Sequence, residues 1–408
     1  MSRMSSKVAF PLIALLSFTV SGFLTIMTEN MPSGLLPSIA KSLDVSESLA
    51  GQLLTLYALG SVVAAIPIVT ATRSISRRPL LMSAILYLLV FNSLTALSGN
   101  YMITLAARFV AGMAAGVIWG LLAGYARRLV PVEQQGKAMA IVGVGQPIAL
   151  SLGVPLGAWM GTFLQWQGVF WTMSAVALIL LIWIRLAVPN IPGQPADRNL
   201  PLRRVLMLPG LRTTLLVIFL WILAHNILYT YIAPFTADVG LGEENTGVVL
   251  LVFGLSSVVG VWLVGTQIDR ALRRMTLASL VGFAAAAVLL AFASQSEWLA
   301  FVGIALWGLS FGGAPTLLQT ATADAGGEEA DVAISMLVTV FNVAVAGGGL
   351  LGGVLLPVTG VEVFPWILFG LALFALLVTW SSRQGFRPGR RGATATADPT
   401  ISEADAVH

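Results

Sequence analysis

Long apolar segments dominate this chain, and short polar or charged loops separate them. Each segment has about 20 residues or more, enough to cross a hydrocarbon core of roughly 30 Å as a helix. Twelve can be marked, with approximate bounds 9–39, 49–71, 80–98, 101–126, 138–162, 168–188, 212–236, 246–267, 276–294, 298–320, 332–357 and 363–381. The pattern predicts twelve transmembrane helices.

Helices are favoured over a β-barrel because the apolar residues run continuously instead of alternating with polar ones. The composition agrees: 57% of the residues are hydrophobic, 10% are charged, and the mean hydropathy is +0.90. A soluble domain carries about 25% charged residues, so this chain could not cover a water-facing surface. We therefore expect an all-α integral membrane fold.

The basic residues predict the orientation. Of the 22 Lys and Arg, all but Lys41 and Arg108 lie at the N-terminus, in the loops after even-numbered segments, or in the C-terminal tail. The opposite loops are mainly acidic. Because basic loops stay in the cytoplasm, we expect a multi-pass protein of the bacterial inner membrane with both termini cytoplasmic. One loop on the basic side departs from the pattern, since it carries acidic residues at 324, 328, 329 and 331.

Several function classes are disfavoured by what the sequence lacks. The bases are spread over loops without interleaved aromatic residues, so the pI near 9.7 is not a nucleic-acid signal. The chain has no cysteine, which excludes disulfides and thiolate metal sites. It also has no Gly-x-x-x-x-Gly-Lys-Ser/Thr loop for ATP phosphates. We expect no cofactor, no metal and no enzymatic activity.

The segment boundaries suggest four parts. Residues 1–188 and 212–383 each hold six apolar segments, and 189–211 is a proline-rich linker expected to be stiff and extended. Residues 384–408 have little to bury and are expected to be a disordered cytoplasmic tail. The N-terminal apolar run resembles a signal peptide, but its length and the lack of a clear cleavage site favour a retained first span.

The two halves match each other at a constant offset of 196 positions. The offset carries Arg73 onto Asp269, Gln146 onto Asn342, and Gly112 onto Gly308. The match is of positions and residue types, with weak identity. In a membrane protein, repeated halves commonly enclose a substrate site at their interface, so the repeat points to a transporter.

Several motifs resemble the major facilitator superfamily. Its loop signature has a Gly, an Asp-Arg pair that begins four positions later, and then two more bases. The second copy fits it at Gly265, Asp269, Arg270, Arg273 and Arg274. The first copy departs from it: Val69, Arg73 and Ser74 replace Gly, Asp and Arg, whereas Arg77 and Arg78 are kept.

Three further segments resemble the drug/proton antiporter branch, the arabinose-efflux-like exporters. They are Thr28–Pro37 in span one, Arg108 with its following glycines in span four, and Gly145–Gly157 in span five. The resemblance covers nearly the whole chain and implies two pseudo-symmetric six-helix bundles.

Glu29 and Arg108 are the candidate proton-coupling residues. A charge at the centre of a lone helix costs roughly 2.5–3.5 kcal/mol, so each should face a partner or a water-filled cavity. The resemblance places spans one and four along the central cavity and makes Glu29 the proton site, with Arg108 opposing protonation or relaying the proton. The alternatives are a Glu29 held by headgroups and an Arg108 that only packs.

Polar and aromatic residues within the spans are candidates for the substrate cavity: Asn30, Tyr57, Trp119, Gln146, His225, Asn226, Tyr229, Gln319 and Asn342. Interhelical hydrogen bonds or packing are the alternative for each of them. The gating candidates are the loop clusters, read as cytoplasmic latches, and the small residues of span five: Arg73, Arg77, Arg78, Asp269, Arg270, Arg273, Arg274, Gly153, Pro155 and Gly157. Topology and packing are the alternatives.

The leading hypothesis is a proton-coupled exporter of drug-like compounds, sugars or metabolites that works by alternating access. Its partners would be a small-molecule substrate, a proton and membrane lipid, and it would act as a monomer. An uncoupled facilitator or importer is the first alternative. A polytopic membrane enzyme is remote because the chain has only two histidines, one of them at the C-terminus.

Overall fold

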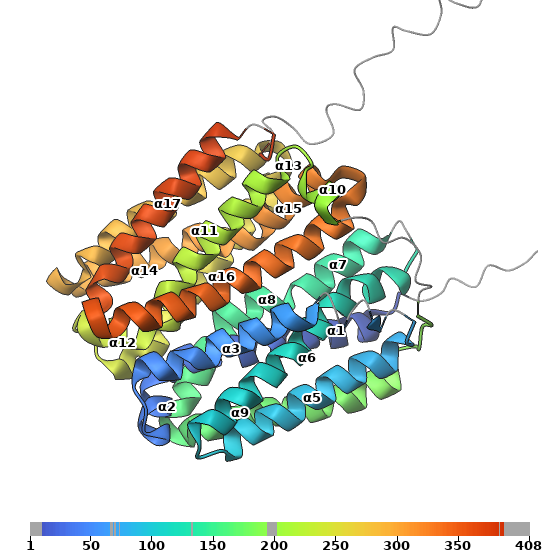
Figure 1. Cartoon of the computed structure of the whole chain (residues 1–408), viewed down its shortest axis with the longest axis horizontal. Helices are drawn as coiled ribbons and strands as arrows, with labels where there is room; N and C mark the ends of the chain where they lie inside the picture. The colour runs from blue at the N-terminus through green and yellow to red at the C-terminus, as the bar shows by residue number, and fades with distance from the viewer. Residues whose placement is uncertain are drawn as a thin grey trace, which may run out of the picture.

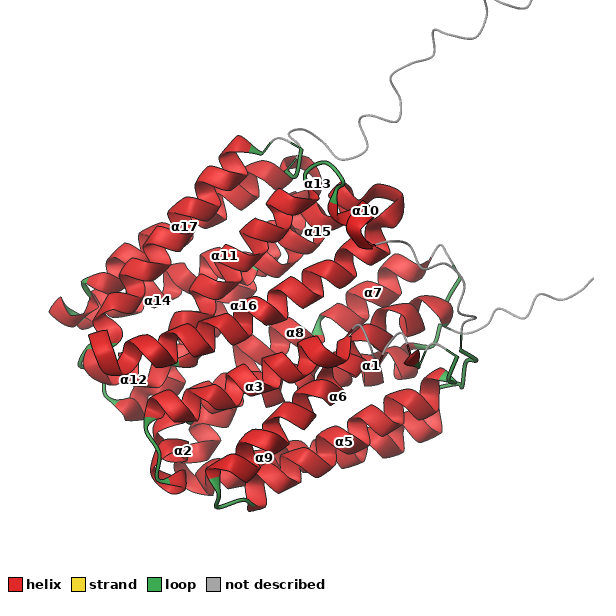
Figure 2. Ribbon diagram, in the orientation of Figure 1, coloured by secondary structure: helices red, strands yellow, loops and turns green. Residues whose placement is uncertain are grey.

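In a computed structural model, described residues are 10–65, 68, 71–72, 74–131, 134–193, 202–382 and 384–386. These ranges contain helices and no strand (Figures 1 and 2). The helices are α1 (Leu12–Gly34), α2 (Leu36–Leu43), α3 (Glu47–Ala65), α5 (Arg77–Leu97), α6 (Tyr101–Arg128), α7 (Gln135–Gly143), α8 (Gly145–Ile148), α9 (Val154–Ala187), α10 (Leu202–Leu206), α11 (Leu211–Thr230), α12 (Ile232–Asp238), α13 (Thr246–Ala291), α14 (Glu297–Gly312), α15 (Ala314–Gly326), α16 (Ala330–Thr359) and α17 (Phe364–Ser381).

The predicted twelve-span, all-α membrane fold is confirmed. Two long helices each contain two spans, because α9 breaks at Gln165 and α13 breaks at Ala271, where the backbone is not helical. By length and apolar composition alone, ten stretches of the described chain could cross a membrane. One of these, Lys137–Ala187, includes the break at Gln165 and so accounts for two spans. The ten do not include α3, which is the second span and completes the twelve.

Four spans are interrupted near prolines, which remove a backbone donor from the helix. The first span breaks at Leu35 between α1 and α2, and the seventh breaks at Tyr231 between α11 and α12. These two breaks are related by the 196-position offset. A π-helical turn, Ala149–Gly153, lies between Pro147 and Pro155 in the fifth span, and the tenth span breaks at Gly313. Such breaks let neighbouring side chains and backbone groups meet inside the bundle.

Helices α1 to α9 form one group and α11 to α17 the other (Figure 1). Within the first group, α3 packs on α6, and α5 packs on α6 and α9; within the second, α11 packs on α16 and α17, and α13 packs on α14. The groups meet where α3 contacts α16 and where α9 contacts α13.

Two stretches flanking the groups differ from the sequence expectation. Part of the predicted extended linker is helical, since α10 lies within 189–211. Residues at the start of the predicted disordered tail are packed, because Phe386 is 0% exposed. The outer bounds of the four predicted parts stay predictions.

Most of the described charges near helix ends separate by sign onto two ends of the bundle, with Lys41, Asp324 and Glu329 as exceptions. Arg77 and Arg128 lie at helix ends on one side, and Arg273 lies there beside the break of α13 at Ala271; we call this side the basic end. Glu47, Glu297 and Asp238 lie at helix ends on the other side, the acidic end. This separation follows from the alternating direction of successive spans.

Glycines on α6 and α14 bring backbones into direct contact. A Cβ on Gly112 would overlap the carbonyl of Tyr57 on α3, and a Cβ on Gly308 would overlap the carbonyl of Phe253 on α13. The two contacts are equivalent under the repeat. Small residues permit this approach, which drives helix association in lipid.

We therefore predict that Gly112→Ala and Gly308→Ala each lower the thermal midpoint of the purified protein by several degrees, because overpacking costs typically about 1–3 kcal/mol. Gly124→Ala is the matched control on α6, since a Cβ there meets nothing within 4 Å. A thermal melt in detergent measures both. Equal midpoints for Gly112→Ala and Gly124→Ala would contradict the packing role.

Candidate functional site

Arg108 is a fully buried charge at the centre of the first helix group. Its side chain is 0% exposed. Nε donates to the Leu53 carbonyl on α3 at 3.4 Å, and Nη2 donates to the Glu29 carbonyl on α1 at 3.2 Å. The guanidinium carbon lies 4.5 Å from the ring centre of Tyr57 and 5.6 Å from that of Phe170 on α9. One cation thus links three neighbouring helices to its own.

The arrangement leaves part of the guanidinium unused. Within the described chain, Arg108 Nη1 is buried and has no hydrogen-bond partner. The Tyr57 ring packs against the guanidinium, and the Tyr57 hydroxyl donates a hydrogen bond to the Thr25 carbonyl at 3.0 Å. Arg108 is therefore held rigidly while retaining a free donor.

The Glu29 carboxylate faces a cavity between the two helix groups. Arg108 is close enough for electrostatic attraction to this carboxylate, but the recorded hydrogen bond goes to the Glu29 backbone. No hydrogen bond or ion pair to the carboxylate itself is recorded among the described residues. A carboxylate so placed can exchange a proton with water in the cavity and still feel a fixed positive charge.

The cavity has a volume of about 100 Å³. It is lined by α1, α6 and α8 from one group and by α15 and α16 from the other, with Ile26, Glu29, Trp119, Gln146, Pro315, Leu318, Gln319, Leu337, Val338, Phe341 and Asn342 at its surface. Typical small-molecule pockets have roughly 300–1,000 Å³, so a sugar-sized solute requires the two groups to part further.

Five of the predicted site residues come together in this cavity: Glu29, Trp119, Gln146, Gln319 and Asn342. Asn342 also donates to the Val338 carbonyl of its own helix at 2.9 Å. Two further asparagines predicted to line the cavity make the same kind of bond but are not among its lining residues. Asn30 donates to the Ile26 carbonyl at 3.1 Å, and Asn226 donates to the Ile222 carbonyl at 2.9 Å.

His225 and Tyr229 lie in an aromatic cluster of the second group, away from this cavity. The His225 ring stacks on Phe311 with 3.6 Å between ring centres, and Phe253 and Trp307 pack around it. The repeat relates His225 to Glu29, Phe253 to Tyr57, and Ile304 to Arg108. At equivalent positions, the first half thus has a charged pair and the second half has an aromatic cluster.

A set of hydrogen bonds joins the two groups at the acidic end; we call it the acidic-end seal. Gln52 on α3 donates to the Gly349 carbonyl at 3.3 Å and to the Tyr231 hydroxyl at 3.4 Å, and Ser48 donates to the Gly353 carbonyl. Within the second group, Tyr231 donates to the same Gly349 carbonyl at 2.8 Å. Sequence reasoning missed this set as a site. The glycines of span eleven were the available signal, because they permit close approach to α3.

The loop arginines bind carbonyl groups within their own helix group. Arg273 donates to the carbonyls of Thr379 at 3.0 Å, Trp380 at 2.6 Å and Ser382 at 2.8 Å, at the end of α17. Arg78 donates to the Val188 carbonyl at 3.3 Å, just after α9. Arginines thus brace the ends of spans six and twelve, although the 196-position offset pairs Arg273 with Arg77 and not with Arg78.

The remaining gating candidates are placed as follows. Gly153 and Gly157 press against Met27 and Met31 of α1, and Pro155 follows the π-helical turn. Arg270 and Arg274 lie on α13 near its break at Ala271. Arg73 and the side chain of Asp269 lie outside the described residues, so the predicted latch stays a prediction.

Comparison with known proteins decides the family. The family model described as Major Facilitator Superfamily matches residues 18–330 and 215–398, nearly the whole chain. The chain belongs to the Major Facilitator Superfamily. As a member of this superfamily it is a multi-pass membrane transporter of small molecules.

Similar proteins share most of their length with this superfamily member. A probable sugar efflux transporter of Helicobacter pylori strain J99 is 27% identical over 90% of this chain and 94% of its own. One from Pasteurella multocida is 28% identical over 90% and 92%. A Pseudomonas aeruginosa protein named transcription regulatory protein OpdE is 29% identical over 89% and 92%.

A solved structure supports the major facilitator fold. The human organic anion transporter MFSD10 superposes with a TM-score of 0.68, covering 90% of this chain and 99% of that one at 18% identity. At this identity the likeness concerns the fold alone.

We predict that Arg273→Ala lowers the thermal midpoint by several degrees, because each lost hydrogen bond from a charged group contributes roughly 1.5–3 kcal/mol before solvent screening. Arg274→Ala is the control, since it removes the same charge one position along and no hydrogen bond is recorded for Arg274. A melt of both variants checks this. If both lose the same stability, the effect comes from loop charge and not from bracing of α17.

Proposed function

We propose that this transporter is a proton-coupled exporter of sugars or related small polar molecules. The observation that carries the proposal is the Glu29 carboxylate, which faces the cavity between the halves without a recorded partner, beside a buried Arg108. The names of the curated relatives support a sugar as the substrate class. The inner-membrane location, cytoplasmic termini and monomeric state belong to the same proposal.

The cavity lining suits a substrate with many hydroxyl groups. Gln146, Gln319 and Asn342 offer amides that both donate and accept hydrogen bonds, and Trp119 offers a flat apolar face. Sugars combine hydroxyl edges with apolar ring faces. A sugar bound here would touch side chains from both halves, so its binding could be linked to their relative movement.

The charges suggest how a proton could be exchanged for the substrate. A proton taken up by Glu29 neutralises the carboxylate and removes its attraction to Arg108. When the proton leaves toward the basic end, the carboxylate regains its charge, and Arg108 stabilises it. The acidic-end seal must open for protons to enter and for sugar to leave on that side. The movement of two bundles around one site then gives antiport.

We expect Glu29→Gln to abolish sugar-dependent proton movement while sugar binding persists, because the amide cannot carry a proton but keeps the size and polarity of the side chain. The measurement uses proteoliposomes with an enclosed pH-sensitive dye and an imposed proton gradient. Glu297→Gln, which removes a carboxylate at the acidic end, serves as the control and should behave as wild type.

The outcomes separate the candidate functions. Unaltered sugar flux in Glu29→Gln, without proton movement in either protein, would establish an uncoupled facilitator. Proton movement that persists in Glu29→Gln would assign coupling to another residue.

We further expect Gln319→Ala to raise the KM for the transported sugar roughly two- to tenfold with a smaller effect on kcat, as for the loss of about 0.5–1.5 kcal/mol from one hydrogen bond. Gln295→Ala at the acidic end is the matched control. Initial rates of sugar uptake into inverted vesicles give both constants. A KM that is identical in the two variants would place the sugar elsewhere.

A further inference from the structure

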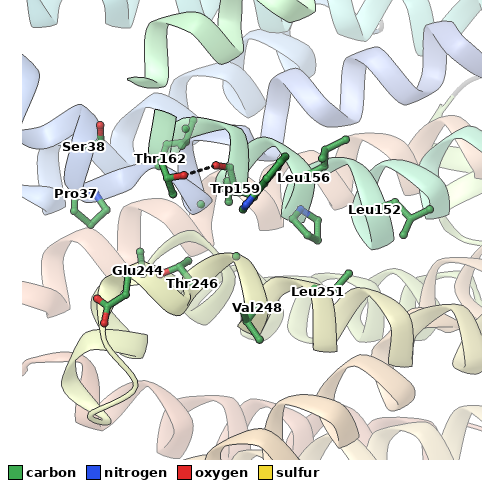
Figure 3. A pocket seen from close by; sticks show the side chains of 17 residues that line it. Pro37, Ser38, Leu152, Leu156, Trp159, Thr162, Glu244, Thr246, Val248 and Leu251 are labelled. Atoms are coloured by element: carbon green, nitrogen blue, oxygen red, sulfur yellow. Dashed lines mark hydrogen bonds between the residues drawn. The ribbon is translucent and has the colours of Figure 1, made fainter. Parts of the chain in front are cut away.

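A second hollow lies where the two halves meet at the membrane face of the bundle, apart from the cavity that holds Glu29. It is a groove of about 590 Å³ between α9 of the first group and α13 of the second, at the acidic end. Figure 3 shows Leu152, Leu156 and Trp159 on one wall, and Val248 and Leu251 on the other. We call it the α9–α13 groove.

The walls of the groove suit a hydrocarbon chain. Leu152 is 50% exposed, Leu156 53% and Trp159 59%, so these side chains face the bilayer instead of protein. Leu152 and Thr162 are ten positions apart on this wall, which spans about 15 Å along a helix. A single acyl chain lying along the wall would replace the missing neighbours of these side chains.

The floor of the groove is the seam between the two halves. A Cβ on Gly34 would lie 2.9 Å from Ala158 on α9 and 3.1 Å from Leu250 on α13. One turn deeper, a Cβ on Gly254 would overlap the carbonyl of Ser151. The helices that form the walls therefore belong to bodies that alternating access must move, and the groove changes shape when they do.

The end of the groove nearest the membrane surface is polar. Ser38, Thr162 and the carboxylate of Glu244 line it, with Glu244 exposed on the short turn before α13. Figure 3 places Ser38 and Thr162 on one wall and Glu244 on the other. The Thr162 hydroxyl donates to the Trp159 carbonyl at 2.8 Å, which leaves the Ser38 hydroxyl as the donor for a ligand. A lipid that fits must carry a positive group for Glu244, an acceptor for Ser38, and an acyl chain that lies between the two walls.

We propose that the α9–α13 groove is a binding site for an aminophospholipid, with the ammonium on Glu244, a phosphate or ester oxygen on the Ser38 hydroxyl, and one acyl chain between α9 and α13. Phosphatidylethanolamine has this chemistry. Its small primary ammonium can approach the carboxylate closely, whereas the methyl groups of phosphatidylcholine prevent hydrogen bonding and phosphatidylglycerol has no cation. The bound lipid contacts both halves, so its binding depends on how the halves are arranged at the acidic end.

The test measures lipid retention by native mass spectrometry of the full chain, after exchange into equal mixtures of phosphatidylethanolamine, phosphatidylcholine and phosphatidylglycerol. We expect wild type to retain phosphatidylethanolamine roughly two- to fivefold over the others, the size expected of one partly exposed ion pair. Glu244→Gln should reduce this preference to about one while total lipid retention persists. Glu297→Gln, an acidic-end carboxylate outside the groove, should keep it.

A second pair of variants tests the acyl chain. Val248→Trp fills the groove and should remove the tightly retained lipid, whereas Leu377→Trp on the membrane face of α17 should not. Because the readout is lipid retention, it does not depend on proton coupling or on the transported substrate.

Three results would overturn the proposal. The first is equal retention of the three lipids by wild type, and the second is an unchanged preference in Glu244→Gln. The third is Glu244-dependent binding of dodecyltrimethylammonium without retention of phosphatidylethanolamine, which would make the groove a site for cationic amphiphiles.

Discussion

The first helix group is organised around the burial of one permanent charge. Arg108 has no exposed surface, and a guanidinium in such a place must be compensated by backbone carbonyls and aromatic faces. Helices α1 and α3 supply the carbonyls, and Tyr57 and Phe170 supply the rings. These contacts fix the depth of Glu29 in the bundle, and with it the position of the carboxylate at the cavity between the halves.

The equivalent region of the second group has, among its described residues, no buried charge to compensate. With Ile304 in place of Arg108 and His225 in place of Glu29, there is no fixed cation, and stacked rings fill the space. A duplicated architecture thus carries an ionic centre in one half and an apolar one in the other. Shared helix geometry, such as the contacts of Gly112 and Gly308 with neighbouring carbonyls, is kept in both halves. At these positions the helix geometry is kept while the chemistry of the inward side chains diverges.

Different hydrogen bonds join the two halves to each other and fix the helix ends within each half. In the acidic-end seal, side chains of α3 donate to backbone carbonyls of α16, and a Cβ at Gly349 or Gly353 would overlap α3, so small residues are required there. At the basic end, Arg78 and Arg273 bind carbonyls within their own group. The described hydrogen bonds across the halves at the seal are few and formed by neutral groups, which suits an interface that must open and close repeatedly.

The sequence by itself determined the solvent, the number of spans, the repeat and the candidate charges. Apolar length and continuity are local properties, and the cost of leaving backbone groups unpaired in lipid allows only helices. The breaks at Gln165 and Ala271 were visible as gaps between apolar runs. Five cavity residues could also be selected from the sequence, because polar side chains within spans are rare and mostly face the bundle interior or a cavity.

Only the tertiary structure decided which of those polar groups share a space. Asn30 and Gln146 look alike in sequence, yet one bonds to its own helix and the other lines the cavity. The rotation of each helix about its axis makes this difference, and packing against neighbours sets that rotation. The seal at Gly349 and the α9–α13 groove likewise arise from residues far apart in the chain, because their geometry exists only once the two halves are placed side by side.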